Sequence, residues 1–130
     1  MKTSDFTILF AEDNPDIRRI YEKAFTLEGY KVVVCEHAVR AMAELHDQKI
    51  DLFVTDLEMP EMSTLDLLTM LKKDYPRLPV VVVSGHYKDL EKDFTSRDYS
   101  IRAFLTKPVG LSVLKDKVRE ILGLVPGPKK

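Results

Sequence analysis

The chain has 130 residues, of which 45% are hydrophobic, and this is enough to bury one core without disulfide or metal staples. Its 20 basic and 21 acidic residues give a formal net charge of -1, which excludes the strongly basic balance of a protein that binds nucleic acid or anionic lipid directly. The single cysteine cannot form an internal disulfide, and no signal peptide or long apolar span is visible, so we expect a cytoplasmic protein with no membrane anchor.

The chain opens with a predicted strand followed by a helix. A short apolar run at residues 6–11 leads into two acids, after which Asn14 is placed to cap a helix and Pro15 suits its first turn. Gly29 stands where the cap at the C-terminal end of this helix belongs. The apolar stripe predicted to pack on a sheet is Ile17, Ile20, Tyr21, Ala24 and Leu27, with Arg18, Arg19, Glu22 and Lys23 assigned to solvent.

The same order of strand and helix repeats along the rest of the chain. Further strands are predicted at residues 30–35, 50–56, 80–83 and 101–106. Further helices are predicted at residues 37–48, from a capping sequence at 63–66 onward, at 87–100 and at 111–122. This alternation implies crossovers of one hand and a parallel sheet with helices on both faces. We expect one domain over residues 1–124, with 125–130 as a flexible tail or the start of a linker.

Asp56 stands at the end of the most apolar of these strands. The strand reads as buried on both faces, so the carboxylate lies at its carboxyl end, where open α/β sheets bind ligands. The alternative is that Asp56 only caps the following helix, which is a common role for aspartate. Its position in the sequence does not decide between these two interpretations.

Polar side chains also follow three other predicted strands, and the carboxyl ends of parallel strands share one edge of a sheet. The resulting set is Glu12, Asp13, Asp56, Ser84 and Lys107. Three carboxylates together would repel one another unless a cation sat among them, and hard oxygen ligands suit Mg²⁺. Each residue taken alone is an ordinary turn or strand-end residue, but their coincidence at successive strand ends predicts a magnesium site.

This set of groups also suits phosphoryl transfer. A carboxylate that attacks a phosphoryl group approaches a polyanion, so positive charge must neutralise the phosphoryl oxygens. Lys107 would add an ammonium to the metal ion, and Ser84 a hydroxyl that donates a hydrogen bond. The product would be an aspartyl phosphate on Asp56.

The motifs, taken in order, resemble the receiver domain of two-component response regulators over residues 7–122. The acidic pair of that family corresponds to Glu12 and Asp13, and its Ser-small and Lys-Pro pairs begin at Ser84 and Lys107. The aromatic switch position, three residues before the lysine, is Phe104. The phosphoacceptor motif of the family reads here as Asp56-Leu57-Glu58-Met59-Pro60-Glu61-Met62.

The resemblance implies a flavodoxin-like α/β fold, a doubly wound five-stranded parallel sheet in the order 2-1-3-4-5. It implies that Mg²⁺ is held by Asp13 and Asp56 directly, by the backbone carbonyl of Glu58, and by Glu12 largely through water. It further implies that Asp56 accepts a phosphoryl group from a sensor histidine kinase or a phosphotransfer protein. Ser84 would then move toward the phosphoryl oxygens, and the ring of the switch residue would turn inward.

Such a switch would change the surface over the fourth helix, fifth strand and fifth helix, where a downstream protein or effector domain binds. A homodimer that forms on phosphorylation is a further alternative. Glu58 and His86 occupy positions that, in the family, influence the lifetime of the phosphoryl group, although both can equally be exposed loop residues. Cys35, His37 and His46 have no metal-ligand spacing and are interpreted as structural or solvated.

Two features depart from the family pattern, namely Thr64 in place of a glycine and the stretch 98–103 in place of Ala-Gly-Ala. They motivate a second hypothesis, a pseudo-receiver that binds partners without being phosphorylated. A third is a phosphatase with an aspartyl nucleophile, as in the haloacid dehalogenase family. That family has a second aspartate two residues after the first, where this chain has Glu58.

Overall fold

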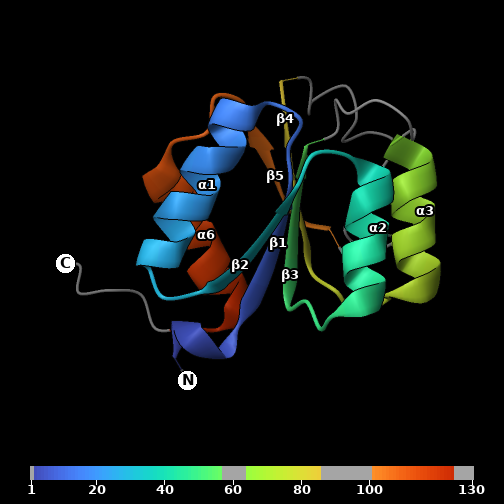
Figure 1. Ribbon diagram of the computed structural model, residues 1–130, viewed down its shortest axis with the longest axis horizontal. Coiled ribbons are helices and arrows are strands. Elements are labelled where there is room, and N and C mark those ends of the chain that lie inside the picture. Colours follow the sequence, from blue (N-terminus) through green and yellow to red (C-terminus); the bar gives the residue numbers. More distant parts are fainter. Residues whose placement is uncertain (1, 57–63, 86–100, 125–130) are drawn as a thin grey trace.

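The computed structural model describes residues 2–56, 64–85 and 101–124, which form a parallel sheet between two layers of helices (Figure 1). The strands are β1 (Thr7–Ala11), β2 (Lys31–Cys35), β3 (Leu52–Asp56), β4 (Val80–Ser84) and β5 (Ile101–Thr106). The helices are a short 3-10 turn, η1 (Thr3–Asp5), and α1 (Pro15–Leu27), α2 (Ala38–Asp47), α3 (Thr64–Asp74) and α6 (Leu111–Leu122). The helix predicted at 87–100 and the tail predicted at 125–130 lie outside the described residues.

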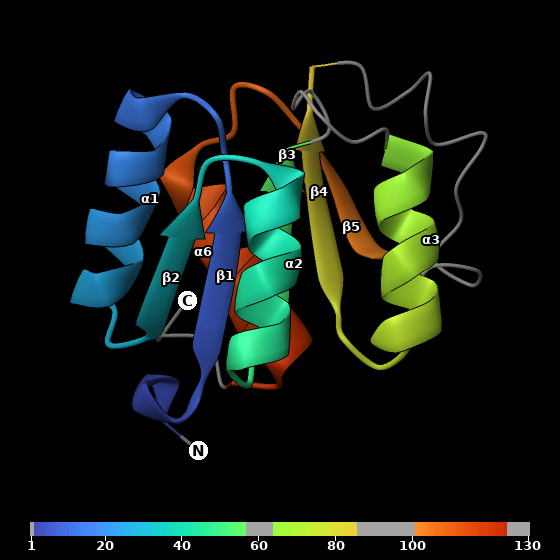
Figure 2. The same cartoon turned by 45° about the vertical axis from the view of Figure 1, so that its right-hand side comes forward.

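The five strands are parallel and pair in the order β2-β1-β3-β4-β5 (Figure 2). This confirms the predicted doubly wound, flavodoxin-like architecture. Every residue of β3 and of β4 is buried, because helices cover both faces of the sheet at its centre. The strand order places the carboxyl ends of β1 and β3 next to each other, with β4 and β5 following on the same edge.

Two apolar cores form because successive side chains of a strand point to opposite faces. Leu9 and Phe53 face the core beneath α2 and α3, together with Leu68. Phe10 faces the other core, beneath α1 and α6, where its ring lies 5.0 Å from that of Phe25. Burying each such side chain contributes roughly 1.5–3 kcal/mol relative to leaving it exposed. The two cores, one on each face, stabilise the sheet and so fix the positions of the strand ends.

Helix α1 begins and ends as predicted, but its buried stripe differs. Asn14 caps it by accepting hydrogen bonds from the backbone amides of the next turn, and Gly29 follows it with a φ of 102°. Tyr21 and Phe25 are buried, whereas Ile20 is 50% exposed and Leu27 78% exposed, so the predicted stripe was wrong at these two positions. The helix contacts the sheet along an i, i+4 ridge, and the two exposed residues lie on its flank.

The other helices agree more closely with the sequence pattern. Ala38 and Leu45 of α2 and Leu114 and Val118 of α6 are buried. Gly123 ends α6 in the left-handed conformation, with a φ of 74°. No helix among the described residues combines the length and the apolar character needed to cross a membrane.

Candidate functional site

The predicted acids meet where β1 and β3 end. One carboxylate oxygen from each of Glu12, Asp13 and Asp56 lies within 4.8 Å of the others. Glu12 and Asp56 are buried, at 1% and 2% exposure, whereas Asp13 is exposed. The fold brings these residues together because β1 and β3 are neighbouring parallel strands with Ala11 opposite Thr55, so that the residues that follow in each strand direction, Glu12 and Asp56, lie side by side. The set is therefore an acidic cluster with one side open to solvent.

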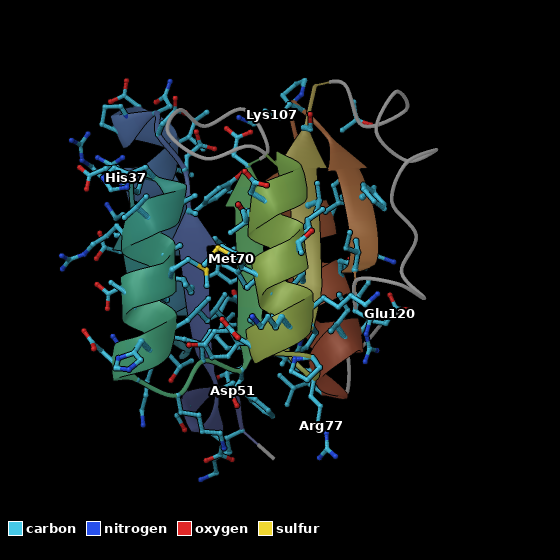
Figure 3. All side chains as sticks on the ribbon, turned by 90° about the vertical axis from the view of Figure 1, so that its right-hand side faces the viewer. His37, Asp51, Met70, Arg77, Lys107 and Glu120 are labelled. Carbon is cyan, nitrogen blue, oxygen red and sulfur yellow. The ribbon has the colours of Figure 1, made fainter. Side chains whose placement is uncertain are left out.

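Lys107 reaches this cluster from the end of β5. Its Nζ lies 2.7 Å from Oδ2 of Asp56 and 3.3 Å from Oε1 of Glu12. Figure 3 shows Lys107 at this edge of the sheet and Asp51 and Arg77 at the opposite edge. Burial lowers the pKa of Lys107, but the hydrogen bond and charge of Asp56 and the charge of Glu12 outweigh burial and raise the pKa above its ordinary value. The ammonium is thus held charged between two buried carboxylates.

The pKa of Glu12 is raised, chiefly because burial removes water from its carboxylate. The charge of Asp56 adds to the rise, while the backbone amide of Asn14, 3.1 Å from Oε2, and the Lys107 ammonium oppose it. Two buried carboxylates, those of Glu12 and Asp56, thus contact one ammonium, that of Lys107. Three hard oxygen ligands at this spacing, with solvent access on the Asp13 side, fit a divalent cation such as Mg²⁺ that retains water ligands.

Arg18 belongs to the site, although the sequence pattern assigned it to solvent. Its Nη1 donates to the backbone carbonyl oxygens of Glu12, at 2.8 Å, and Asp13, at 3.4 Å. The side chain folds back from the first turns of α1 onto the loop that carries both acids. The only signal in the sequence was its spacing of five and six residues from the acidic pair.

The two predicted switch residues lie on adjacent strands beside the cluster. Ser84 ends β4, is fully buried, and its carbonyl oxygen accepts a hydrogen bond of 3.1 Å from the backbone amide of Lys107. Phe104 of β5 is half-buried, pairs in register with Val82, and packs against the core beneath α2 and α3. The remaining predicted site residues, Glu58 and His86, lie outside the described residues.

The histidines and the cysteine have structural surroundings. His37 caps α2, with its Nδ1 accepting from the backbone amide of Arg40 at 3.2 Å, a role that the sequence pattern did not reveal. His46 is exposed next to Asp47. Cys35 is buried, and burial raises the pKa of its thiol to about 11. None of the three belongs to the group of candidate metal ligands found among the described residues.

Comparison with known proteins gives a consistent picture. The family model of the response regulator receiver domain matches residues 8–119. The chain is 30% identical over 122 residues to chemotaxis protein CheY1 of Helicobacter pylori, covering 89% of this chain and 96% of CheY1. It is 29% identical over 115 residues to the transcriptional regulatory protein GlrR of Escherichia coli, covering 88% of this chain. The chain spans only 26% of the length of GlrR. Its fold matches a crystal structure of a response regulator receiver protein from Pseudomonas putida with a TM-score of 0.79 and 32% sequence identity, and the match covers 88% of this chain and 96% of that protein.

Proposed function

The chain belongs to the response regulator receiver family of two-component signalling, and we propose that it is a phosphorylation-operated switch whose phosphoacceptor is Asp56. The family is regulatory, so the domain is not an enzyme in the classical sense. The observation that carries the proposal is the buried carboxylate of Asp56, which lies 2.7 Å from the Lys107 ammonium and within the acidic cluster. We propose that the receiver domain comprises residues 1–124.

In the proposed reaction, a carboxylate oxygen of Asp56 attacks the phosphorus of a phosphohistidine. The P–O bond forms as the P–N bond breaks, and the electron pair of that bond leaves with the imidazole nitrogen. Lys107, already within hydrogen-bond distance of Asp56, is placed to bind a phosphoryl oxygen and to neutralise charge as it develops. Asp56 is only 2% exposed, which limits the water that competes for the acceptor.

We assign Glu12, Asp13 and Asp56 as the residues that would hold Mg²⁺, with the backbone carbonyl of Glu58 added from the family resemblance. The ion would supply positive charge to the phosphoryl oxygens. The acidic cluster supports this assignment, because its three carboxylate oxygens lie close together with a single ammonium among them. Glu58 and His86 are proposed to influence the lifetime of the phosphoryl group.

The proposed output runs through Ser84 and Phe104. The hydroxyl of Ser84 would move to the phosphoryl oxygens, and the ring of Phe104 would turn into the space that this movement opens. Phenylalanine has no hydroxyl, so turning its ring inward would leave no buried polar group without a hydrogen-bond partner. The surface that would change includes β5 and α6, where we propose that a downstream protein or an effector domain binds.

The upstream partner is proposed to be a sensor histidine kinase or a phosphotransfer protein, in a cytoplasmic setting. Phosphorylation-dependent homodimerisation is an alternative route of output. The relatives include a protein of nearly the length of this chain, CheY1, and one more than three times as long, GlrR. The conformational change, rather than a product, would carry the signal.

Incubation with Mg²⁺ and a small phosphodonor tests the proposal by intact mass. We expect one added phosphoryl group, lost in Asp56→Asn and lost when the metal is chelated. Asp47→Asn is the matched control, because Asp47 is an exposed aspartate of α2 whose side chain pairs only loosely with His46, at 3.3 Å. Absence of any adduct, or its persistence in Asp56→Asn, defeats the assignment of Asp56.

The same experiment separates the two other hypotheses. A pseudo-receiver would take up no phosphoryl group, and Asp56→Ala would leave its partner binding unchanged. The departure at Thr64 that motivated this hypothesis has not prevented α3 from beginning at that residue. A phosphatase would instead turn over a small phosphate ester without accumulating the adduct.

A further inference from the structure

We propose that Arg18 is a positioning residue for the metal site, an inference that rests on the proposed binding of Mg²⁺ by the acidic cluster. The geometry points to this role because one guanidinium nitrogen, Nη1, contacts the backbone of both acids on the β1–α1 loop. Its distances are 2.8 Å to the carbonyl oxygen of Glu12 and 3.4 Å to that of Asp13. Arg18 would touch neither the phosphoryl group nor the ion, and would act through the loop.

The loop needs such a contact because its two acids are anchored unequally. Glu12 is fixed by burial, by its backbone amide bonding the Cys35 carbonyl at 3.0 Å, and by its carboxylate accepting from the Asn14 amide. Asp13 is exposed, so packing does little to orient its carboxylate. The backbone on either side of Asp13 is what fixes it, and Arg18 holds the carbonyl side of that backbone.

Helix α1 makes the contact rigid. The cap residue Asn14 accepts from the amides of Asp16 and Ile17, and the Arg18 amide donates to the Asn14 carbonyl at 3.0 Å. The guanidinium therefore projects from an ordered first turn and closes a ring from the helix back to the loop. Contacts of this outer kind orient metal ligands, and their loss weakens metal binding by roughly 10–100-fold.

A positive charge near a cation site has the opposite effect. The positive charge of Arg18 repels a bound Mg²⁺, so removing only that charge would tighten Mg²⁺ binding. The effect would be about twofold or less, because water and salt screen the interaction between a guanidinium and an ion that it does not touch. The two contributions differ in sign, and the positioning contribution is the larger. The direction of the change in affinity therefore distinguishes them.

The neighbouring Arg19 is a matched control. It has the same side chain and charge, it lies on the same turn, and it is 73% exposed with an ion pair of 3.4 Å to Asp16. Replacing Arg19 removes a positive charge near the loop and leaves the contact between Arg18 and the Glu12 carbonyl intact. Arg18→Met keeps most of the length and apolar stem of the side chain and removes every donor.

Calorimetric titration of the full chain with MgCl₂ gives the affinities, and urea unfolding in EDTA reports the fold. We expect Mg²⁺ binding about tenfold weaker in Arg18→Met. We expect an unchanged or slightly tighter affinity in Arg19→Met, and an intermediate loss in Arg18→Lys, which keeps the charge and a single donor group. Amide NMR shifts of Glu12 and Asp13 should change in metal-free Arg18→Met and stay unchanged in Arg19→Met.

Equal or tighter Mg²⁺ binding in Arg18→Met overturns the inference, as does an equal loss in Arg19→Met. If Arg18→Met fails to fold, Arg18→Lys decides, and wild-type affinity with wild-type loop shifts in that variant overturns the positioning role. Failure of the wild-type chain to bind Mg²⁺ would instead defeat the proposed metal site itself, so the two failures are distinguishable.

Discussion

Removing Lys107 tests the electrostatics of the site most directly. In Lys107→Met the ammonium is lost while Glu12 and Asp56 remain buried next to each other. Removing one partner of a fully buried ion pair costs about 3–5 kcal/mol, because the other partner stays desolvated. The Lys107 side chain is 23% exposed at an open edge, so water replaces part of the lost interaction. We therefore expect the free energy of unfolding in EDTA to fall by about 2 kcal/mol.

The assay is urea unfolding followed by far-UV circular dichroism at pH 7. The folded-state pKa of Lys107 is raised above its ordinary value of 10.5, so its contribution is complete at neutral pH. It is lost only as the pH rises through the folded-state pKa, and the difference between the proteins should shrink there. Saturating Mg²⁺ should also narrow the difference, since a ligand that binds only the folded state stabilises it, and the variant no longer has an ammonium competing for Asp56.

Lys49→Met is the matched control for this experiment. Lys49 is 90% exposed, and its Nζ lies 4.0 Å from Oδ1 of Asp51, at the opposite edge of the sheet. An exposed pair of this kind contributes about 0–1 kcal/mol, so its loss should change the free energy of unfolding little. Wild-type stability of Lys107→Met in EDTA would refute the reasoning, because the two carboxylates would then not depend on the ammonium.

Three further predictions concern single groups. Burial raises the pKa of Glu12 above 4.5, so the stability that the protonated carboxyl contributes is present below pH 4.5 and is lost as the pH rises through the folded-state pKa. In urea unfolding with EDTA, Glu12→Gln should remove this fall in the free energy of unfolding with pH. Asn14→Ala should lower the free energy of unfolding by about 1 kcal/mol, since two backbone amides lose their acceptor, as urea unfolding would measure. Cys35, with a pKa of about 11 and 4% exposure, should resist a thiol reagent at pH 8 in the folded chain and react after denaturation, and rapid labelling of the native protein would contradict its burial.

The sequence predicts which polar residues meet at this end of the sheet, because their meeting depends on topology. Once the strands are identified and are parallel, the residues that follow them must share an edge. This places the Lys107 ammonium 2.7 Å from Asp56 and 3.3 Å from Glu12. Buried strands such as β4 are also legible, because four consecutive valines suit a sheet covered on both faces. These features need only the order of elements along the chain.

Features that depend on side-chain direction were not predictable in the same way. The pattern of α1 did not separate the ridge that faces the sheet from its flank, so Ile20 and Leu27 were assigned to the core. The sequence pattern assigns Arg18 to solvent and His37 to a structural or solvated role. It does not show that Arg18 bonds the backbone carbonyls of the acidic pair or that His37 caps α2. A long polar side chain has many rotamers, and the tertiary structure selects the one that meets an unpaired carbonyl or amide.

The charges at the site support the proposed switch. Two of the three carboxylates, those of Glu12 and Asp56, contact the Lys107 ammonium, and a divalent cation would add positive charge to the cluster. Phosphorylation, as proposed, would change the charge at Asp56 from that of a carboxylate to about -2. The new charge must find donors close by, and Ser84, buried at the end of the next strand, is within the same edge. Phe104 lies two positions before Thr106, the partner of Ser84 on β5, so the proposed shift of that serine would take place one strand away from the half-buried ring.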